Sequence, residues 1–217
     1  MVGKLSRGLA SVAKAKGVQV IGGRGAFEDS RTIRVGGDEP QVVRFKHAVI
    51  AVGSLPMVPP GLALESDRVM DSTAALEVPD IPERLLVIGG GYIGLELGQV
   101  YAALGSRVTL VEMTDGLLPG ADRDLVQPLA RRCEKLFSAI HLKTKVTALK
   151  EVGDTIEAAV EGQDVQAFDR VLVAVGRRAV SESLGLETTK VKLADRGFVL
   201  VDERCRTSDP HVYAVGI

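Results

Sequence analysis

The chain has 217 residues, with 27 Lys and Arg against 28 Asp and Glu, and 46% of its residues are hydrophobic. This length suits one large or two ordinary domains, and the apolar fraction is enough for a hydrophobic core. Charges of both signs are interspersed, so composition favours neither a nucleic-acid partner nor a membrane surface. No apolar run approaches the roughly 20 residues of a membrane span, and no signal-peptide segment opens the chain, so we expect a cytoplasmic protein.

The cysteines and histidines give no sign of a catalytic or metal site. Cys133 and Cys205 lie in unrelated segments, without the spacing of a metal site or a C-x-x-C motif. Isolated thiols of this kind are usually small buried side chains. His47, His141 and His211 share no spacing with each other or with a nucleophile. We therefore predict no metal ion and no catalytic histidine.

The first third of the chain predicts a helix followed by short strands. Residues 5–16 have an amphipathic helical pattern that ends at Gly17. Alternating or apolar runs predict a strand over 18–21, a glycine-rich strand or turn over 22–27, a hairpin over 32–35 and 41–45, and a buried strand over 47–52. Three of the nine prolines lie in 55–61, which predicts a crossing between domains.

The strongest pattern begins with an apolar strand, 84–88, of the kind that is buried on both faces of a parallel sheet. Directly after it, Gly89, Gly91 and Gly94 occupy the fixed positions of G-x-G-x-x-G. This motif opens a helix whose free N–H groups and dipole can hold a pyrophosphate. Gly89 permits the tight turn, Gly91 lets phosphates approach the backbone, and Gly94 lets the helix lie close to the sheet.

The pattern continues through a helix to a second strand. Gly94, Gly98 and Ala102 place small side chains on one face of that helix, and Gly105 is expected to end it. Residues 106–112 predict a second parallel strand that ends in Glu112, about 20 residues after the first glycine, a spacing that suits a carboxylate on the adenine-ribose hydroxyls. A similar turn kept only for packing would leave Glu112 without a role.

The remaining elements alternate between helices and strands. Asp71 is expected to cap a helical turn over 71–76, and Asp122 to cap a helix that runs to 136. Strands are predicted over 140–142, 146–149, 156–160, 167–175, 198–201 and 212–215, with turns at 153–154 and 162–163.

Four motifs together resemble one family. They are Ala-Val-Gly-Ser-x-Pro at 51–56, Gly-Gly-Gly-Tyr-Ile-Gly-Leu-Glu at 89–96, Ala-Val-Gly-Arg-Arg at 174–178 and Thr-Ser-x-Pro-x-x-Tyr-Ala-Val-Gly at 207–216. Over essentially its whole length the chain resembles the pyridine-nucleotide disulfide oxidoreductases, most closely the dihydrolipoamide dehydrogenases. The resemblance implies a central fragment of such an enzyme. The family's first FAD fold with its redox cysteine pair, and its dimerisation domain with a His–Glu base pair, would lie outside these residues.

The resemblance also implies a fold and domain limits. The expected fold is α/β: a Rossmann-like parallel sheet with crossover helices and a β-meander, flanked by partial FAD-domain segments. The NAD-binding domain would occupy 71–190, and the FAD-domain segments would be 1–70 and 191–217. Ile217 stands where the family usually has an Asp that reaches the flavin, so FAD binding by these segments is in question.

Site residues follow from the same resemblance. The NAD pyrophosphate would lie on Gly89, Gly90, Gly91, Tyr92, Ile93 and Gly94, and Glu112 would take the adenine ribose. Glu96 would lie near the nicotinamide, and Val146 and Gly176 would line the adenine and nicotinamide ends. Tyr92 matches a position that gates the nicotinamide pocket in some relatives, or is an ordinary aromatic over the turn. On the flavin side the matching residues are Gly25, Val52, Gly53 and Ser54.

The implied activity is the oxidation of dihydrolipoyl groups of 2-oxoacid dehydrogenase complexes through a redox disulfide and FAD, with NAD as acceptor. Lipoyl domains and a second copy of the enzyme would be the partners, and this fragment is expected to be inactive alone. The alternatives are a glutathione or mercuric reductase, or a non-catalytic NAD-binding module. Those reductases generally prefer NADP, whose 2′-phosphate Glu112 would repel, so we predict a preference for NADH over NADPH.

Overall fold

The computed structural model describes residues 2–216, without the side chain of Val2; Ile217, with the expectation that concerns it, lies outside this range. The chain divides into two compact units: unit 1 is residues 1–54 with 179–217, and unit 2 is residues 55–178. The chain passes between them at β5 (Ser54–Pro56) and β14 (Arg177–Ala179), which form a two-stranded sheet. The first limit precedes the expected one after residue 70, because β6 at 69–70 belongs to the sheet of unit 2. The second precedes the expected one after residue 190, because Leu184 and Leu186 lie in the hydrophobic cluster of unit 1.

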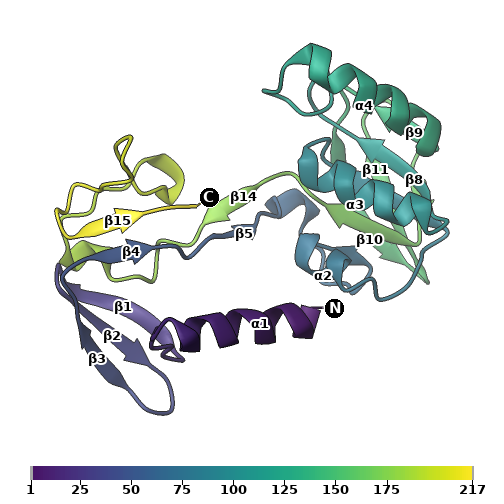
Figure 1. Ribbon diagram of the computed structural model, residues 1–217. Coiled ribbons are helices and arrows are strands. Elements are labelled where there is room, and N and C mark those ends of the chain that lie inside the picture. Colours follow the sequence, from purple (N-terminus) through teal and green to yellow (C-terminus); the bar gives the residue numbers. More distant parts are fainter. Residues whose placement is uncertain (1, 217) are drawn as a thin grey trace. The chain divides into compact units, whose positions relative to one another are not determined.

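Unit 2 is built on a five-stranded sheet in the order β6-β13-β7-β8-β9. Figure 1 labels β8 and β9 of this sheet, with α3 (Tyr92–Ala103) and α4 (Arg123–Leu136) beside them. Its strands are β6 (Val69–Met70), β7 (Arg84–Ile88), β8 (Arg107–Val111), β9 (Ala139–His141) and β13 (Arg170–Val173). Every pairing is parallel, which confirms the predicted Rossmann-like sheet. In β7, Leu85, Leu86 and Val87 are fully buried, as expected for a central parallel strand.

Successive side chains of β7 enter two different hydrophobic clusters, because a strand points them to opposite faces. Leu85 and Val87 pack with side chains of the helices α2 (Ser72–Leu76), α3 and α4. Leu86 and Ile88 pack with those of the antiparallel strands β10 (Val146–Val152), β11 (Thr155–Val160) and β12 (Gln166–Phe168). The sheet is therefore covered by helices on one face and by the predicted meander on the other.

The helix ends follow the sequence signals in part. The Asp71 carboxylate accepts from the backbone N–H groups of Thr73 (2.8 Å) and Ala74 (2.9 Å), which confirms the predicted cap. Gly105, with φ +114°, follows the last turn of α3 as expected. Asp122 occupies the N-cap position of α4 as predicted, although its side chain accepts from no N–H group of the helix.

The predicted strand over 167–175 is two strands. Residues of β12 pair antiparallel with β11, whereas β13 pairs parallel with β6 and β7. Asp169 separates them, and its carboxylate accepts from the N–H (2.8 Å) and guanidinium (2.6 Å) of Arg84. A continuous apolar run could not reveal this change of sheet. The two-residue turn at Gly153–Asp154 between β10 and β11 is as predicted.

Unit 1 contains α1 (Val2–Ala15), the antiparallel sheet of β1 (Arg24–Asp29), β2 (Thr32–Gly36) and β3 (Gln41–Arg44), and the parallel pair of β4 (Ala48–Ile50) and β15 (Val212–Ala214). The predicted helix and hairpin are confirmed. The predicted strands at 18–21 and 198–201 are wrong: apart from a single bridge at Val199, neither segment pairs with a strand. The strand around Val49 exists but is not buried throughout, since Val49 is 61% exposed.

In the part of the chain that the structure describes, none of the helices combines the length and apolar character needed to cross a membrane.

Candidate dinucleotide site

The turn between β7 and α3 has the glycine requirements that the motif predicts. Gly89 has φ +110°, and a Cβ atom there would lie 2.4 Å from the carbonyl oxygen of Ala174. A Cβ atom on Gly94 would lie 2.1 Å from the oxygen of Gly89. Both positions therefore exclude larger residues for reasons internal to the fold, the first by backbone angle and the second by close packing of α3 on the turn.

Gly91 differs from its neighbours because a Cβ atom there would meet nothing within 4 Å. Its φ of −74° is also open to other residues. The fold itself therefore gives no reason for glycine at this position, whereas a ligand that approaches the backbone would. The first N–H groups of α3, beginning at Tyr92 and Ile93, have no carbonyl partner within the helix and point toward this space with the positive end of the helix dipole.

Glu112 follows β8 at the carboxyl edge of the sheet and is 8% exposed. One carboxylate oxygen accepts from the N–H of Gly90 at 2.6 Å, and the other accepts from the N–H of Thr114 at 2.7 Å. The carboxylate is thus fixed beside the glycine turn, so Glu112 has a structural role even without a ligand, contrary to the expectation from the sequence. Each oxygen also keeps a lone pair for another donor. Because the Gly90 N–H is already bonded, the free donors of the turn are those at the start of α3.

Two further predicted residues lie at the same edge of the sheet. Val146 begins β10 and is 4% exposed, and its cluster includes Ile88 and Val111 at the ends of β7 and β8. Just before it, the N–H of Thr144 donates to the carbonyl oxygen of Glu112 at 3.0 Å. Gly176, with φ +147°, follows the carboxyl end of β13. The structure therefore brings both residues to the edge where the turn lies.

The two predicted side chains on α3 are open to solvent. Tyr92 is the first residue of the helix and is 53% exposed. Glu96 is also exposed, and it begins the second turn of α3 rather than lying in the first. Neither is tied to the body of the protein by packing, so both can adjust to a ligand on the turn.

The predicted flavin-side residues belong to unit 1 or lie at its boundary, whereas the glycine turn belongs to unit 2. Gly25 lies in β1 opposite Val35. Val52 and Gly53 follow β4 and line a pocket of about 90 Å³ together with the end of β15. Ser54 begins β5. Gly53 has φ +70° and open space at its Cβ position, so backbone is accessible there.

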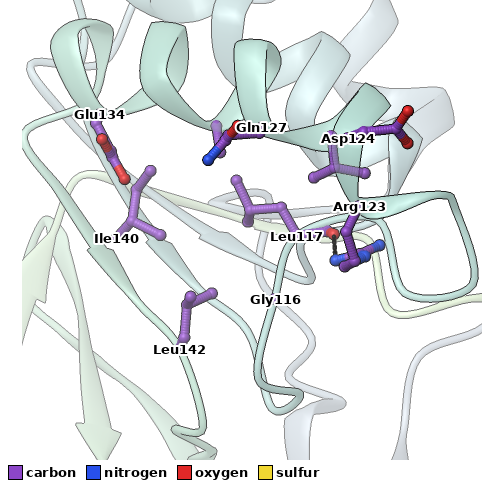
Figure 2. A pocket seen from close by; sticks show the side chains of 10 residues that line it. Gly116, Leu117, Arg123, Asp124, Gln127, Glu134, Ile140 and Leu142 are labelled. Atoms are coloured by element: carbon purple, nitrogen blue, oxygen red, sulfur yellow. Dashed lines mark hydrogen bonds between the residues drawn. The ribbon is translucent and has the colours of Figure 1, made fainter.

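The sequence did not reveal the part played by residues 113–121, which connect β8 to α4. The side chain of Leu117 is 4% exposed, and its Cδ2 atom lies 2.9 Å from where a Cβ atom of Gly90 would be. The N–H of Leu118 donates to the carbonyl oxygen of Gly90 at 2.9 Å. Figure 2 shows Leu117 beside Arg123 at one wall of a pocket of about 380 Å³ under this segment. No local sequence signal marks these contacts.

The cysteines are as expected for isolated thiols. Cys133 is fully buried in the helix-side cluster, and burial raises the pKa of its thiol, so it is not a reactive nucleophile. Cys205 is half-buried and forms no disulfide. Among residues 2–216 no cluster of three or more His, Cys, Asp or Glu side chains could hold a metal ion.

Proteins with similar sequences include dihydrolipoyl dehydrogenases. The chain is 43% identical to the dihydrolipoyl dehydrogenase of Haemophilus influenzae, with 100% of the chain and 46% of that protein covered. It is 40% identical to that of Bacillus subtilis, again over 100% of the chain and 47% of the relative. The chain therefore spans about half the length of the curated relatives it matches.

Solved structures show the same fold. LpdA from Mycobacterium tuberculosis superposes with a TM-score of 0.90 at 23% identity, over 99% of this chain and 48% of that one. The HOCl-induced flavoprotein disulfide reductase RclA from Escherichia coli has a TM-score of 0.82 at 30% identity, over 92% and 45%. The sequence model of the family described as "Pyridine nucleotide-disulphide oxidoreductase" matches residues 1–216. The chain therefore belongs to the pyridine nucleotide-disulphide oxidoreductase family.

Proposed function

We propose that this chain is the NAD-binding portion of a dihydrolipoamide dehydrogenase. The observation that carries the proposal is the Glu112 carboxylate, held at the carboxyl end of β8 by the N–H groups of Gly90 and Thr114. Beside it, the open Cβ position of Gly91 leaves room for a pyrophosphate at the start of α3. This is the usual place for a dinucleotide on a parallel sheet.

The residues present fit NAD in two respects. The space at Gly91 and the N–H groups of Tyr92 and Ile93 suit the pyrophosphate, and the free lone pairs of Glu112 suit the ribose hydroxyls. NAD, when bound, supplies a hydride acceptor. The protein's own part is to fix both ends of the coenzyme, with Val146 on the adenine side and Glu96 and Gly176 on the nicotinamide side. Tyr92, at the exposed start of α3, would cover the nicotinamide.

The activity of the whole enzyme extends the same proposal. Relatives about twice as long are named dihydrolipoyl dehydrogenase. We infer that the intact protein oxidises dihydrolipoyl groups of 2-oxoacid dehydrogenase complexes, as a homodimer that uses a redox disulfide and FAD. Gly25, Val52, Gly53 and Ser54 would contact the flavin, Gly53 through accessible backbone.

In this proposal the 217 residues alone do not catalyse the reaction, because Cys133 and Cys205 are not spaced as a redox pair. NAD reduction by the purified chain with dihydrolipoamide and added FAD would contradict this.

Coenzyme choice separates this function from the NADP-dependent alternatives. A 2′-phosphate placed at Glu112 would meet a buried carboxylate, and among residues 2–216 no cationic side chain bonds that carboxylate. A phosphate and a carboxylate in direct contact repel each other strongly in a partly buried site. A glutathione or mercuric reductase is therefore the weaker candidate.

The test is a fluorescence titration of the 217-residue chain with NADH and with NADPH. We expect the wild-type chain to bind NADH at least about tenfold more tightly than NADPH. Glu112→Gln should weaken NADH binding and remove most of the preference for NADH, since this substitution deletes the charge that repels the 2′-phosphate. Glu134→Gln, an exposed carboxylate on α4, is the control and should leave both affinities unchanged. Equal affinity of the wild-type chain for the two coenzymes would overturn the assignment of Glu112.

A further inference from the structure

The segment 113–121 is the immediate support of the coenzyme-binding groups. Its Thr114 N–H holds one oxygen of Glu112, and its Leu118 N–H holds the carbonyl of Gly90. The Thr114 hydroxyl also donates to the carbonyl of Gly116 at 3.0 Å, within the segment. The direction of the Glu112 carboxylate therefore depends on the position of these residues.

Packing and backbone bonds hold this segment only in part: Leu117 lies in the helix-side cluster, and the Thr114 carbonyl accepts from the N–H of Lys143 at 2.8 Å. The segment contains no helix or strand, and a pocket of about 380 Å³ lies between it, α4 and β9. Leu118 has a φ of +48°, in the left-handed region that a leucine rarely adopts. A segment with a strained residue and a hollow beneath it needs a specific restraint.

Arg123, the first residue of α4, supplies that restraint. Its guanidinium donates to the carbonyl oxygens of Leu117 (3.0 Å), Leu118 (2.6 Å) and Ala121 (2.7 Å from Nη2 and 3.0 Å from Nε). Figure 2 shows the bond to Leu117 at the wall of the pocket. A cation at the first position of a helix is disfavoured by the helix dipole. The helix dipole therefore disfavours the charge of Arg123 at this position, and the hydrogen bonds to the segment offset this cost.

We propose that Arg123 is a positioning residue for coenzyme recognition. It holds the segment 113–121 against the glycine turn, and the segment in turn orients the Glu112 carboxylate toward the adenine ribose. This inference rests on the proposed function. A lysine could not replace it, because one ammonium group lacks the planar fork that reaches three carbonyls at once.

The first test is amide hydrogen exchange in the free 217-residue chain. In Arg123→Met, the amides of Gly90, Thr114 and Leu118 should exchange about tenfold faster, because the segment that donates these hydrogen bonds or orients the Glu112 acceptor is no longer held. Arg123→Lys should exchange nearly as fast as Arg123→Met. The control is Arg131→Met, which removes an exposed cation of the same helix that lines a different recess. Unchanged exchange in Arg123→Met, or full restoration by lysine, would overturn the inference.

The second test is the NADH and NADPH titration. Arg123→Met should weaken NADH binding by about tenfold and reduce the preference over NADPH, because a misaimed carboxylate neither binds the ribose nor repels the phosphate as well. If the wild-type chain does not bind NADH, the proposed function fails, and the recognition role fails with it. If the wild-type chain binds NADH and Arg123→Met binds it equally with the same preference, only the inference about Arg123 is overturned.

Discussion

At the scale of single residues, the glycines of the fingerprint serve different physical needs. Gly94 is required by the fold, because a Cβ atom there would lie 2.1 Å from the backbone oxygen of Gly89. Gly91 is required by neither backbone angle nor packing, since its φ is −74° and its Cβ position is open. A motif read as one unit in the sequence therefore divides into a glycine that the fold requires and a glycine that only the proposed phosphate site would require.

This division predicts opposite outcomes for two alanine substitutions. Gly94→Ala should lower the free energy of unfolding by about 1–3 kcal/mol, because overpacking forces α3 away from the turn. Gly91→Ala should lower it by about 1 kcal/mol or less, the expected effect of alanine at a helix N-cap. NADH binding should nevertheless be lost in Gly91→Ala, because the methyl group occupies the space left for the phosphates. Urea denaturation and NADH titration measure the two effects.

Gly105→Ala serves as a control for the pair, since Gly105 also has a positive φ but lies at the far end of α3 with open space around it. It should lose some stability through backbone strain and keep its NADH affinity. If Gly91→Ala bound NADH as tightly as wild type, the phosphate site would not be where we place it.

Prediction from sequence was most successful where the signal is local. The order of glycines and the carboxylate at 112 follow from spacing alone. The partners of Glu112 could not be predicted, because they depend on how residues 113–121 fold back onto Gly90. The arginine that holds this segment looks like an ordinary exposed charge in the sequence.

At the scale of elements, the correctly predicted strands have an apolar pattern within their own sequence. Whether the other segments form strands depends on the strands available to pair with them. Residues 84–88 and 107–111 are apolar enough to be buried on both faces. Residues 18–21 and 198–201 are equally strand-like but form no strand, apart from the single bridge at Val199, and they are largely exposed. Strand propensity describes a fit to a sheet surface rather than a property of the segment alone.

Asp169 illustrates a junction that only the tertiary structure defines. It separates the meander from the parallel sheet, and its bonds to Arg84 connect β13 to the start of β7. The hydrogen bond from the Arg84 guanidinium, with the Coulombic attraction of the same group, holds the pKa of Asp169 below its usual value despite partial burial.

This lowered pKa predicts how Asp169→Asn depends on pH. A carboxyl whose pKa is lower in the folded state stabilises the protein above its unfolded pKa of about 3.9, and this contribution is lost as the pH falls through the folded value. At pH 7 we expect Asp169→Asn to lower the free energy of unfolding by about 1–2 kcal/mol, since a charged hydrogen bond is replaced by a neutral one. The difference from wild type should shrink as the pH is lowered below about 4.

Denaturation by urea at pH 7, 5 and 3 measures this dependence. Asp154→Asn is the control, because Asp154 pairs with Arg68 but its side chain is 98% exposed; such surface pairs contribute about 0–1 kcal/mol. A difference between wild type and Asp169→Asn that does not change with pH would show that the pair with Arg84 is not the cause.

At the scale of the whole molecule, the two units have separate hydrophobic cores. The clusters on the two faces of the parallel sheet lie entirely within unit 2. The cluster of unit 1 is smaller, with six buried residues around β4 and β15. In the same unit the apolar side chains of α1, Leu5 and Leu9, are 65% and 73% exposed. Buried apolar area is the main favourable contribution to folding, so we expect unit 1 to be the less stable of the two.

We therefore expect two unfolding transitions in a calorimetric scan, with unit 1 melting first. The proposed coenzyme residues lie in unit 2, and a ligand stabilises only the state that binds it. NADH at one hundred times its dissociation constant should stabilise unit 2 by about 2.7 kcal/mol and raise its melting temperature, while the first transition stays in place. NADPH at the same concentration should shift the second transition much less, because Glu112 repels its 2′-phosphate. A single transition that NADH shifts as a whole would contradict this prediction. It would show that the two units unfold together and that NADH stabilises both of them.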